Sequence, residues 1–411
     1  MIRRPVAILA LLTALNLFNY LDRLVLSAVL PRIEDQFALS HGVSGLLGTI
    51  FLVGYFATSP IFGTLADRGA RKGLLAIGIG IWSLATIASG FSRSFAELAV
   101  ARAFVGVGEA SYATIAPTLI DDLAPPERKG SWLAIFYAAM PIGAALGYLT
   151  GGSIDKAYGW RAAFVVAGAP GMLLALLCLL LVEPARTRPS ARPSVLHSWR
   201  ALAASPLYVR GVLGYAMFTF AVGGFAFWGP AYLFRHYGLN LADANKGMGL
   251  VTVLGGALGT TLGGVYADRA TRVVSPGDHE NRSRAFLRVC AVGSLFATPL
   301  AAVAILAPTS TLFFVLFFAC ESAIFLSTSP INAVILESVP SEIRATAMAA
   351  SIFAIHMLGD LWSAPGVGLL ADILPMQVAM LILPCAIALS VAAWWTRGPI
   401  GVGRSPRGQT T

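Results

Sequence analysis

Long apolar stretches alternate with short polar connectors along the whole chain. Each stretch holds the roughly 20 mostly apolar residues that a helix needs to cross a bilayer. Twelve such stretches can be placed, at residues 6–30, 42–65, 73–91, 95–121, 131–154, 161–182, 207–234, 244–267, 285–306, 310–337, 345–371 and 375–396. The pattern therefore predicts an all-α membrane protein with twelve transmembrane helices.

The second half of the chain repeats features of the first. "GTLADRGAR" at 63–71 corresponds to "GGVYADRATR" at 263–272, and "PPERK" in the first half corresponds to "PSEIR" in the second. Two six-helix halves in parallel repeat, with substrate held between them near mid-membrane, form a known transporter architecture. We expect an N-terminal six-helix bundle (1–182), a cytoplasmic linker (183–205), a C-terminal six-helix bundle (206–396) and a cytoplasmic tail (397–411).

Composition and charge placement support a multi-pass membrane protein. The chain is 57% hydrophobic and 12% charged, whereas a soluble domain carries about 25% charged residues. Lys and Arg gather in alternate connectors and at both ends, which predicts cytoplasmic termini in the cell's inner (plasma) membrane. The net charge of +9 is therefore read as a topology signal, and we expect no nucleic-acid partner.

Cofactor and metal chemistry is not indicated by the sequence. The four cysteines lie singly within apolar segments, without the paired spacing of a metal site or a disulfide framework. We find no nucleotide-binding motif, and no set of nucleophile, base and orienting group. We expect no metal, no cofactor and no enzymatic activity.

Charged side chains inside two predicted membrane helices are the main candidates for function. Asp22 and Arg23 lie in "NYLDR" of the first helix, and Arg102 and Glu109 lie in the fourth. An ionised side chain at bilayer depth costs roughly 2.5–3.5 kcal/mol, so each needs a partner or a water-filled cavity. Neighbouring helix residues point about 100° apart, so Asp22 and Arg23 need separate partners. At about 1.5 Å per residue, Asp22 and Arg102 lie roughly 12 and 10 Å below the extracellular ends of their helices and Glu109 roughly 21 Å, so we expect Asp22 to meet Arg102 and Arg23 to reach toward Glu109. A purely structural ion-pair network is the alternative.

Two motifs resemble a known transporter family. The loop signature of the major facilitator superfamily resembles "GTLADRGARK". The Spinster branch of that superfamily, and a bacterial member of it in particular, resembles "RAFVGVGEASYATIAPTLIDDLAPPERKG" together with "NYLDR". Spinster proteins are known for moving lysolipids and sphingosine phosphate. The resemblance implies the superfamily fold and alternating access. It also implies that the Asp and Arg of helix 1 and the Arg and Glu of helix 4 line the cavity, where they serve proton coupling or headgroup recognition.

Roles can be assigned to these residues as expectations. Burial favours the protonated form of a carboxyl group, whereas a neighbouring cation favours the ionised form. A cation that moves could therefore load and unload a proton on Glu109, which we expect to be the main proton carrier, with Asp22 as the second candidate. Arg23 keeps its charge and suits a phosphate or carboxylate. The expected headgroup site comprises Arg23, Arg102, Asn19 and Tyr112.

The second half and the cytoplasmic loops offer further polar candidates. His356 and Asp360 are one helical turn apart, as a pH-responsive pair or an ordinary hydrogen bond, and Glu321 is a buried acid without an assigned role. We expect Asp67 to pair with cations or the start of the eleventh helix when the cytoplasmic side closes; a mere topology signal is the alternative. The expected cytoplasmic gate comprises Gly63, Asp67, Arg68, Arg71, Lys72, Asp268, Arg269 and Arg272.

The leading hypothesis is a proton-coupled secondary active transporter of amphipathic anionic lipids, of the lysophospholipid or sphingosine-phosphate type. The alternative is a superfamily exporter of small organic anions or drugs. A channel or receptor is less favoured, because two repeats around one buried charged site suit alternating access. The expected partners are a lipid-like small molecule and protons, with the chain acting as a monomer.

Overall fold

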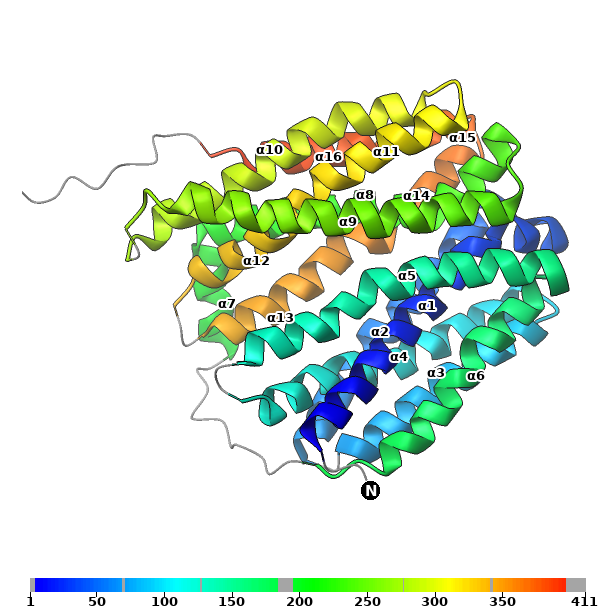
Figure 1. Cartoon of the computed structure of the whole chain (residues 1–411), viewed down its shortest axis with the longest axis horizontal. Helices are drawn as coiled ribbons and strands as arrows, with labels where there is room; N and C mark the ends of the chain where they lie inside the picture. The colour runs from blue at the N-terminus through cyan, green and yellow to red at the C-terminus, as the bar shows by residue number, and fades with distance from the viewer. Residues whose placement is uncertain are drawn as a thin grey trace, which may run out of the picture. The chain divides into compact units, whose positions relative to one another are not determined.

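A computed structural model describes residues 4–68, 71–125, 128–183, 195–275, 277–340 and 343–396. The first six helices are α1 (Pro5–Phe37), α2 (His41–Arg68), α3 (Arg71–Phe91), α4 (Phe95–Leu123), α5 (Lys129–Tyr158) and α6 (Trp160–Leu179) (Figure 1). The later helices are α7 (Val195–Ala204), α8 (Pro206–Tyr237), α9 (Leu241–Thr271), α10 (His279–Ile305), α11 (Ser310–Ile324), α12 (Thr328–Glu337), α13 (Arg344–Ile355), α14 (Leu361–Ala371), α15 (Met376–Ala379) and α16 (Ile382–Trp394).

Twelve helical segments of the described chain are long and apolar enough to span a membrane, which confirms the predicted number. Two spans are interrupted. A 3₁₀ turn at Phe325–Ser327 joins α11 to α12, and a π-helical turn at His356–Asp360 joins α13 to α14. Helix ends were less predictable: α1 continues to Phe37 instead of ending near residue 30.

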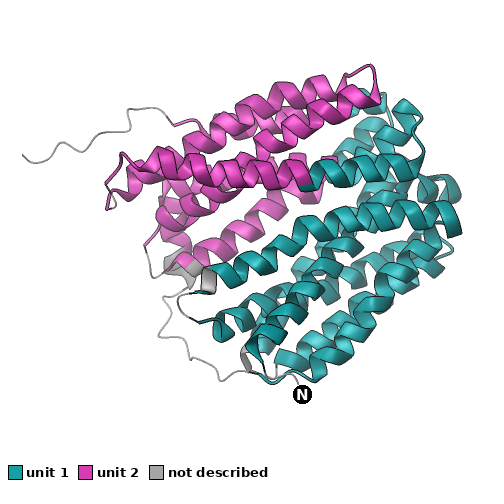
Figure 2. Cartoon of the chain, viewed as in Figure 1, with its two compact units in different colours: residues 1–188, 226–253, 364–379 teal, residues 189–225, 254–363, 380–411 magenta. Residues whose placement is uncertain are grey.

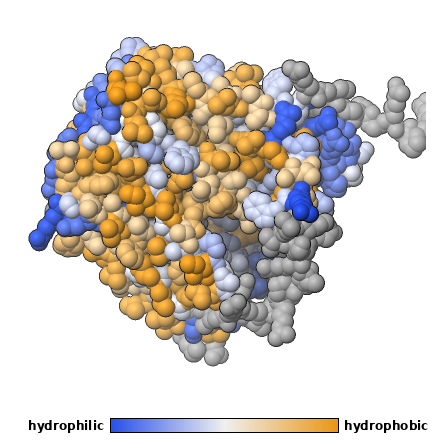
Figure 3. Space-filling view, turned by 180° about the vertical axis from the view of Figure 1, so that it is seen from behind, coloured by the Kyte–Doolittle hydropathy of each residue, from blue (hydrophilic) through white to orange (hydrophobic). Residues whose placement is uncertain are grey.

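The outer surfaces of the spans are apolar. Leu173 and Leu176 of α6 are exposed by 66% and 62%, and Val315 of α11 by 62%. Figure 3 shows mainly hydrophobic residues on the face that it presents. A surface of this kind is stable against lipid and would be a liability in water.

The chain folds into two compact units (Figure 2). Unit 1 contains residues 1–188, 226–253 and 364–379, and unit 2 contains residues 189–225, 254–363 and 380–411. Part of the expected linker forms α7 in unit 2, where Leu202 packs into the apolar cluster of Tyr208 and Ile335.

Glycines let the helices of unit 1 approach closely. A Cβ on Gly143 or Gly147 of α5 would lie 2.3 or 2.4 Å from a carbonyl oxygen of α1, and a Cβ on Gly106 of α4 would lie 2.0 Å from the Phe51 carbonyl oxygen of α2. Small residues allow such backbone contacts between membrane helices. They bring the "NYLDR" turn of α1 next to α5, and the segment of α2 around Phe51 next to α4.

Candidate functional site

Four charged side chains of α1 and α4 form one buried cluster in unit 1. Arg23 Nε donates to Glu109 Oε2 at 2.7 Å. Arg102 Nη1 lies 3.6 Å from Asp22 Oδ1. Asp22 and Glu109 are 0% exposed, and Arg102 is 2% exposed. Both predicted pairings are therefore confirmed, and we call these four residues the charge cluster.

Neutral side chains complete the surroundings of the charge cluster. The Thr86 hydroxyl of α3 donates a hydrogen bond to Asp22. The guanidinium carbon of Arg23 lies 4.9 Å from the Tyr20 ring centre, 5.0 Å from that of Phe51 and 5.6 Å from that of Tyr55. Arginine over aromatic faces is stabilised by cation–π attraction. The sequence prediction missed Thr86 and Phe51, because neither residue type stands out within an apolar helix.

Several buried polar atoms of this region have no hydrogen-bond partner among the described residues. They are Asp22 Oδ1, Asn19 Nδ2, Glu109 Oε1, and Nε and Nη1 of Arg102. The 3.6 Å contact between Arg102 and Asp22 is too long for a hydrogen bond. Native proteins leave few such groups, and a half-satisfied network is costly. The charge cluster thus has spare capacity for water, a proton or a polar ligand.

Tyr112 and Asn19 behave differently from each other. The Tyr112 hydroxyl donates to the Leu12 carbonyl at 2.6 Å, and its ring packs edge-on against Trp82. That phenol therefore fixes α4 against α1. Asn19 is 3% exposed, lies one turn before Arg23 on α1, and retains an unused donor.

The polar candidates of the second half lie in unit 2. His356 Nδ1 is 2.8 Å from Asp360 Oδ1, and this pair spans the π-helical turn. The Thr219 hydroxyl donates to the Ile355 carbonyl at 2.9 Å, beside the turn. π-helical turns are rare and often occur at functional sites. Glu321 of α11 is 4% exposed, against Gly255 of α9.

The expected cytoplasmic gate is described only in part. The side chains of Asp67 and Arg68 lie outside the described residues, so the role of Asp67 stays a prediction. Arg71 is buried and donates to Asp122 Oδ2 at 2.6 Å, which ties α3 to α4.

The remaining gate residues lie mostly at helix ends instead of in loops: Gly63 in α2, Lys72 in α3, and Asp268 and Arg269 in α9. A Cβ on Gly63 would contact Thr114 at 3.6 Å, and the Lys72 backbone N–H donates to Glu183. In the second half, Arg269 lies 5.9 Å from the Tyr266 ring centre, and the Arg272 N–H donates to the Arg269 carbonyl. Asp268 precedes Arg269 near the end of α9.

A second polar cluster, absent from the sequence predictions, lies in unit 1. Glu34 is 3% exposed and accepts hydrogen bonds from Ser44 Oγ at 2.6 Å and Arg235 Nη2 at 2.8 Å. The oxygen that accepts from Ser44, Glu34 Oε1, also lies 2.8 Å from His41 Nδ1. Asp372 accepts from the backbone N–H groups of His41 at 2.7 Å and of Gly42 at 3.0 Å.

We call Glu34, His41, Ser44, Arg235 and Asp372 the polar latch. It ties segments of the second half, residues 226–253 and 364–379, to the start of α2 and the end of α1 within unit 1. The nearby Asn245 side chain also donates to the Ala28 carbonyl at 2.8 Å. Acidic residues at helix ends are usually solvated, so their pairing gives no sequence signal.

Comparisons with known proteins place the chain in a family. Residues 12–364 match the family model for the Major Facilitator Superfamily. Human protein spinster homolog 1 is 36% identical over 398 residues, which cover 90% of this chain and 73% of that protein. The chain belongs to the Spinster branch of this superfamily. It is a membrane transporter, and the described part of the chain contains twelve candidate membrane-spanning helices.

Other relatives of this Spinster-family chain agree with the assignment. The probable sphingolipid transporter spinster homolog 2 of Arabidopsis thaliana is 31% identical, covering 95% of this chain and 86% of that protein. The crystal structure of a bacterial homolog of the human lysosomal transporter Spinster, in an inward-facing and unoccupied conformation, has a TM-score of 0.83. It is 22% identical and covers 95% of this chain and 96% of that chain, which shows the shared fold.

Asp372→Ala should lower the melting temperature of the purified protein. The substitution removes the acceptor of two backbone N–H groups at the start of α2, and losing such a cap costs about 0.5–2 kcal/mol. Asp35→Ala is the matched control, because Asp35 is 57% exposed beside Arg235 and an exposed ion pair contributes at most about 1 kcal/mol. Equal losses in the two variants would contradict the capping role.

The effect of Asp372→Ala should depend on pH. Partial burial acts to raise the pKa of Asp372, but hydrogen bonds from Ser40, Gly42 and His41 outweigh it and hold that pKa below 3.8. The stabilisation is therefore complete well above pH 3.8 and is lost as the pH falls through the lowered pKa. A melting-temperature difference that stays constant from neutral pH to pH 3 would refute this.

Proposed function

We propose that the chain is a proton-coupled secondary active transporter of amphipathic anionic lipids, of the lysophospholipid or sphingosine-phosphate type. It would work as a monomer by alternating access, in the inner membrane with both termini cytoplasmic. The observation that carries the proposal is the charge cluster, which places two guanidinium groups and two carboxyl groups together in a largely buried site, where several of their atoms have no hydrogen-bond partner among the described residues.

Competition for Arg23 supplies the coupling step of the proposal. A guanidinium group stays charged at working pH, so only Asp22 and Glu109 can exchange protons within the charge cluster. An anionic headgroup that binds Arg23 displaces the Glu109 carboxylate from its 2.7 Å contact. A buried carboxylate without its cation is costly and takes up a proton instead. Substrate anion and proton would therefore bind together, with Asp22 and Arg102 as a second, looser pair.

Aromatic side chains favour a lipid over a small organic anion. The rings of Tyr20, Phe51 and Tyr55 surround the Arg23 guanidinium on several sides. Such rings present a large apolar area beside the cation, which suits a charged headgroup that continues into a hydrocarbon chain. The Arabidopsis relative named as a probable sphingolipid transporter supports the same substrate class.

Purified protein in liposomes should take up an anionic lysolipid unchanged, driven by an imposed pH gradient. Glu109→Gln should abolish the stimulation by the gradient, because the amide keeps the shape of the carboxyl group but cannot carry a proton. Glu97→Gln is the matched control, since Glu97 lies on the same helix at its exposed first turn. Gradient-driven accumulation by the Glu109→Gln protein would overturn the proton role; uptake of small organic anions only would support the exporter alternative.

Arg23→Gln should weaken binding of an anionic lysolipid by roughly ten- to a hundredfold. A charge-assisted hydrogen bond contributes about 1.5–3 kcal/mol, which corresponds to that range. Arg23→Lys should recover part of the loss, because lysine keeps the charge but lacks the planar fork. A neutral lysolipid of equal chain length is the control. Equal losses for both lipids would mean that Arg23 is structural and the headgroup is recognised elsewhere.

A disulfide between α5 and α9 should block transport reversibly. A Cβ on Gly249 would lie 3.6 Å from the Ala145 Cβ, which is within the range of disulfide-bonded cysteines. Oxidised Ala145→Cys/Gly249→Cys protein should lose uptake if these helices must separate, and reduction should restore it. Each single cysteine variant is a control. Full uptake by the oxidised, cross-linked protein would exclude separation at this contact.

A further inference from the structure

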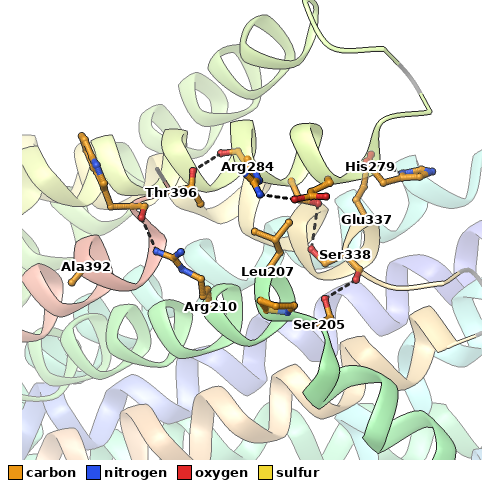
Figure 4. Close-up of a pocket in the computed structure, with 13 residues that line it drawn as sticks. Ser205, Leu207, Arg210, His279, Arg284, Glu337, Ser338, Ala392 and Thr396 are labelled. Carbon is orange, nitrogen blue, oxygen red and sulfur yellow. Dashed lines mark hydrogen bonds and ion pairs between the residues drawn. The ribbon is translucent and has the colours of Figure 1, made fainter. Parts of the chain in front are cut away.

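Unit 2 contains a cavity of about 930 Å³ where several spans begin or end (Figure 4). Its walls come from the start of α8, the start of α10, the end of α12 and the end of α16. The ends of spanning helices lie at the headgroup level of a bilayer. The cavity therefore lies where a phospholipid carries its phosphate, and none of its residues belongs to the charge cluster or the polar latch.

Arg210 is the cation of this cavity that lacks an acidic partner. Its Nε donates to the Ala393 carbonyl at 2.9 Å, and its Nη2 donates to the Trp395 carbonyl at 2.6 Å. Both acceptors are neutral backbone groups at the end of α16. They orient the guanidinium without cancelling its charge, and no carboxylate of the described chain forms an ion pair with it.

The other charges near the cavity are already paired. Glu280 lies 2.5 Å from Arg284. Glu337 lies 3.0 Å from Arg282 and 3.2 Å from His279. These pairs leave the charge of Arg210 in excess, which matches the single negative charge of a phosphodiester. Arginine forks suit phosphate oxygens.

A hydroxyl group and apolar side chains complete the fit. The cavity is also lined by Ser205, Ser283, Ser338 and Thr396, and by Pro206, Leu207, Ala392 and Trp395. The hydroxyls of Ser205, Ser338 and Thr396 donate to the Ser338 carbonyl, the Ser283 hydroxyl and the Arg284 carbonyl, which leaves the Ser283 hydroxyl, of these four, as the donor for a ligand. Trp395 is 49% exposed, and tryptophan is enriched at the membrane–water interface. Residues 397–411 contain three arginines and no acidic residue, so this adjoining segment is a poor electrostatic match for Arg210.

We propose that this cavity binds the phosphodiester headgroup of a membrane phospholipid, with Arg210 as the main phosphate ligand and Trp395 against the glycerol region. Basic pockets between membrane helices at one membrane face are a known mode of headgroup recognition. The bound lipid is a resident of unit 2 and is distinct from the transported substrate. The site does not depend on the proposed proton coupling.

Native mass spectrometry of the full chain, titrated with phosphatidylglycerol, phosphatidylcholine and inorganic phosphate, tests the proposal. The wild-type protein should retain one tightly bound phospholipid, and Arg210→Gln should weaken that binding at least tenfold. Arg93→Gln, which removes an arginine before α4 in unit 1, should leave it unchanged. Similar affinities for the two phospholipids would support recognition of the phosphodiester itself.

Arg210 also holds the end of α16, so Arg210→Gln could lose the lipid through misfolding. A second variant with Arg210 intact separates the two causes. Ala392→Trp adds bulk to the cavity without altering a charge, and it should also displace the lipid. Retention of the lipid at wild-type affinity in either Arg210→Gln or Ala392→Trp would overturn the proposal. Displacement of the lipid by inorganic phosphate at equal concentration would overturn the proposal as well, because it would show that the cavity binds free phosphate.

Discussion

The Arg23–Glu109 ion pair is the contact on which the arrangement of unit 1 depends. Arginine cannot shed its charge at membrane depth, so α1 can carry Arg23 only where a partner or a water-filled cavity receives it, and here the Glu109 carboxylate of α4 is that partner. Removing one partner of a buried pair leaves an uncompensated charge and costs about 3–5 kcal/mol. Around the 2.7 Å contact, glycines permit close packing of α5 on α1 and of α4 on α2.

Stability alone does not account for keeping these charges. Replacing a buried ion pair by well-packed apolar residues is often neutral or stabilising, and this network leaves buried oxygen and nitrogen atoms without a hydrogen-bond partner in the part of the chain that the structure describes. The two pairs also differ: Arg23–Glu109 is a close hydrogen-bonded pair, whereas Asp22–Arg102 is held at 3.6 Å with Thr86 as a further donor. A ligand can rearrange such a network at a modest cost in free energy, because one pair is loosely held and several atoms still lack hydrogen bonds. This property suits a binding site better than a structural core.

The sequence was informative where one physical constraint dominates. Bilayer thickness determines how long an apolar run must be, so the spans were predictable, and the fixed rise of a helix gave the depths of Asp22, Arg102 and Glu109 and hence their pairing. The contacts of Thr86, Glu34 and Asp372 were not predictable, because they depend on which helix ends meet in three dimensions. Tyr112 shows the same limit: its hydroxyl is used by a backbone carbonyl of α1, which no local pattern indicates.

The contacts of the polar latch have the energetic scale that the alternating access proposed above would need. Hydrogen bonds to charged groups contribute about 1.5–3 kcal/mol each, and the latch has few of them, on Glu34 and Asp372. Moving a two-state equilibrium from 1:99 to 99:1 requires about 5.5 kcal/mol of differential binding. Four such bonds contribute on the order of 6–12 kcal/mol, which is the same order of magnitude, whereas a large apolar interface would hold one state too firmly. If the charge cluster works as proposed, a bound anion and a proton there would have to supply a differential binding energy of similar size to open these contacts.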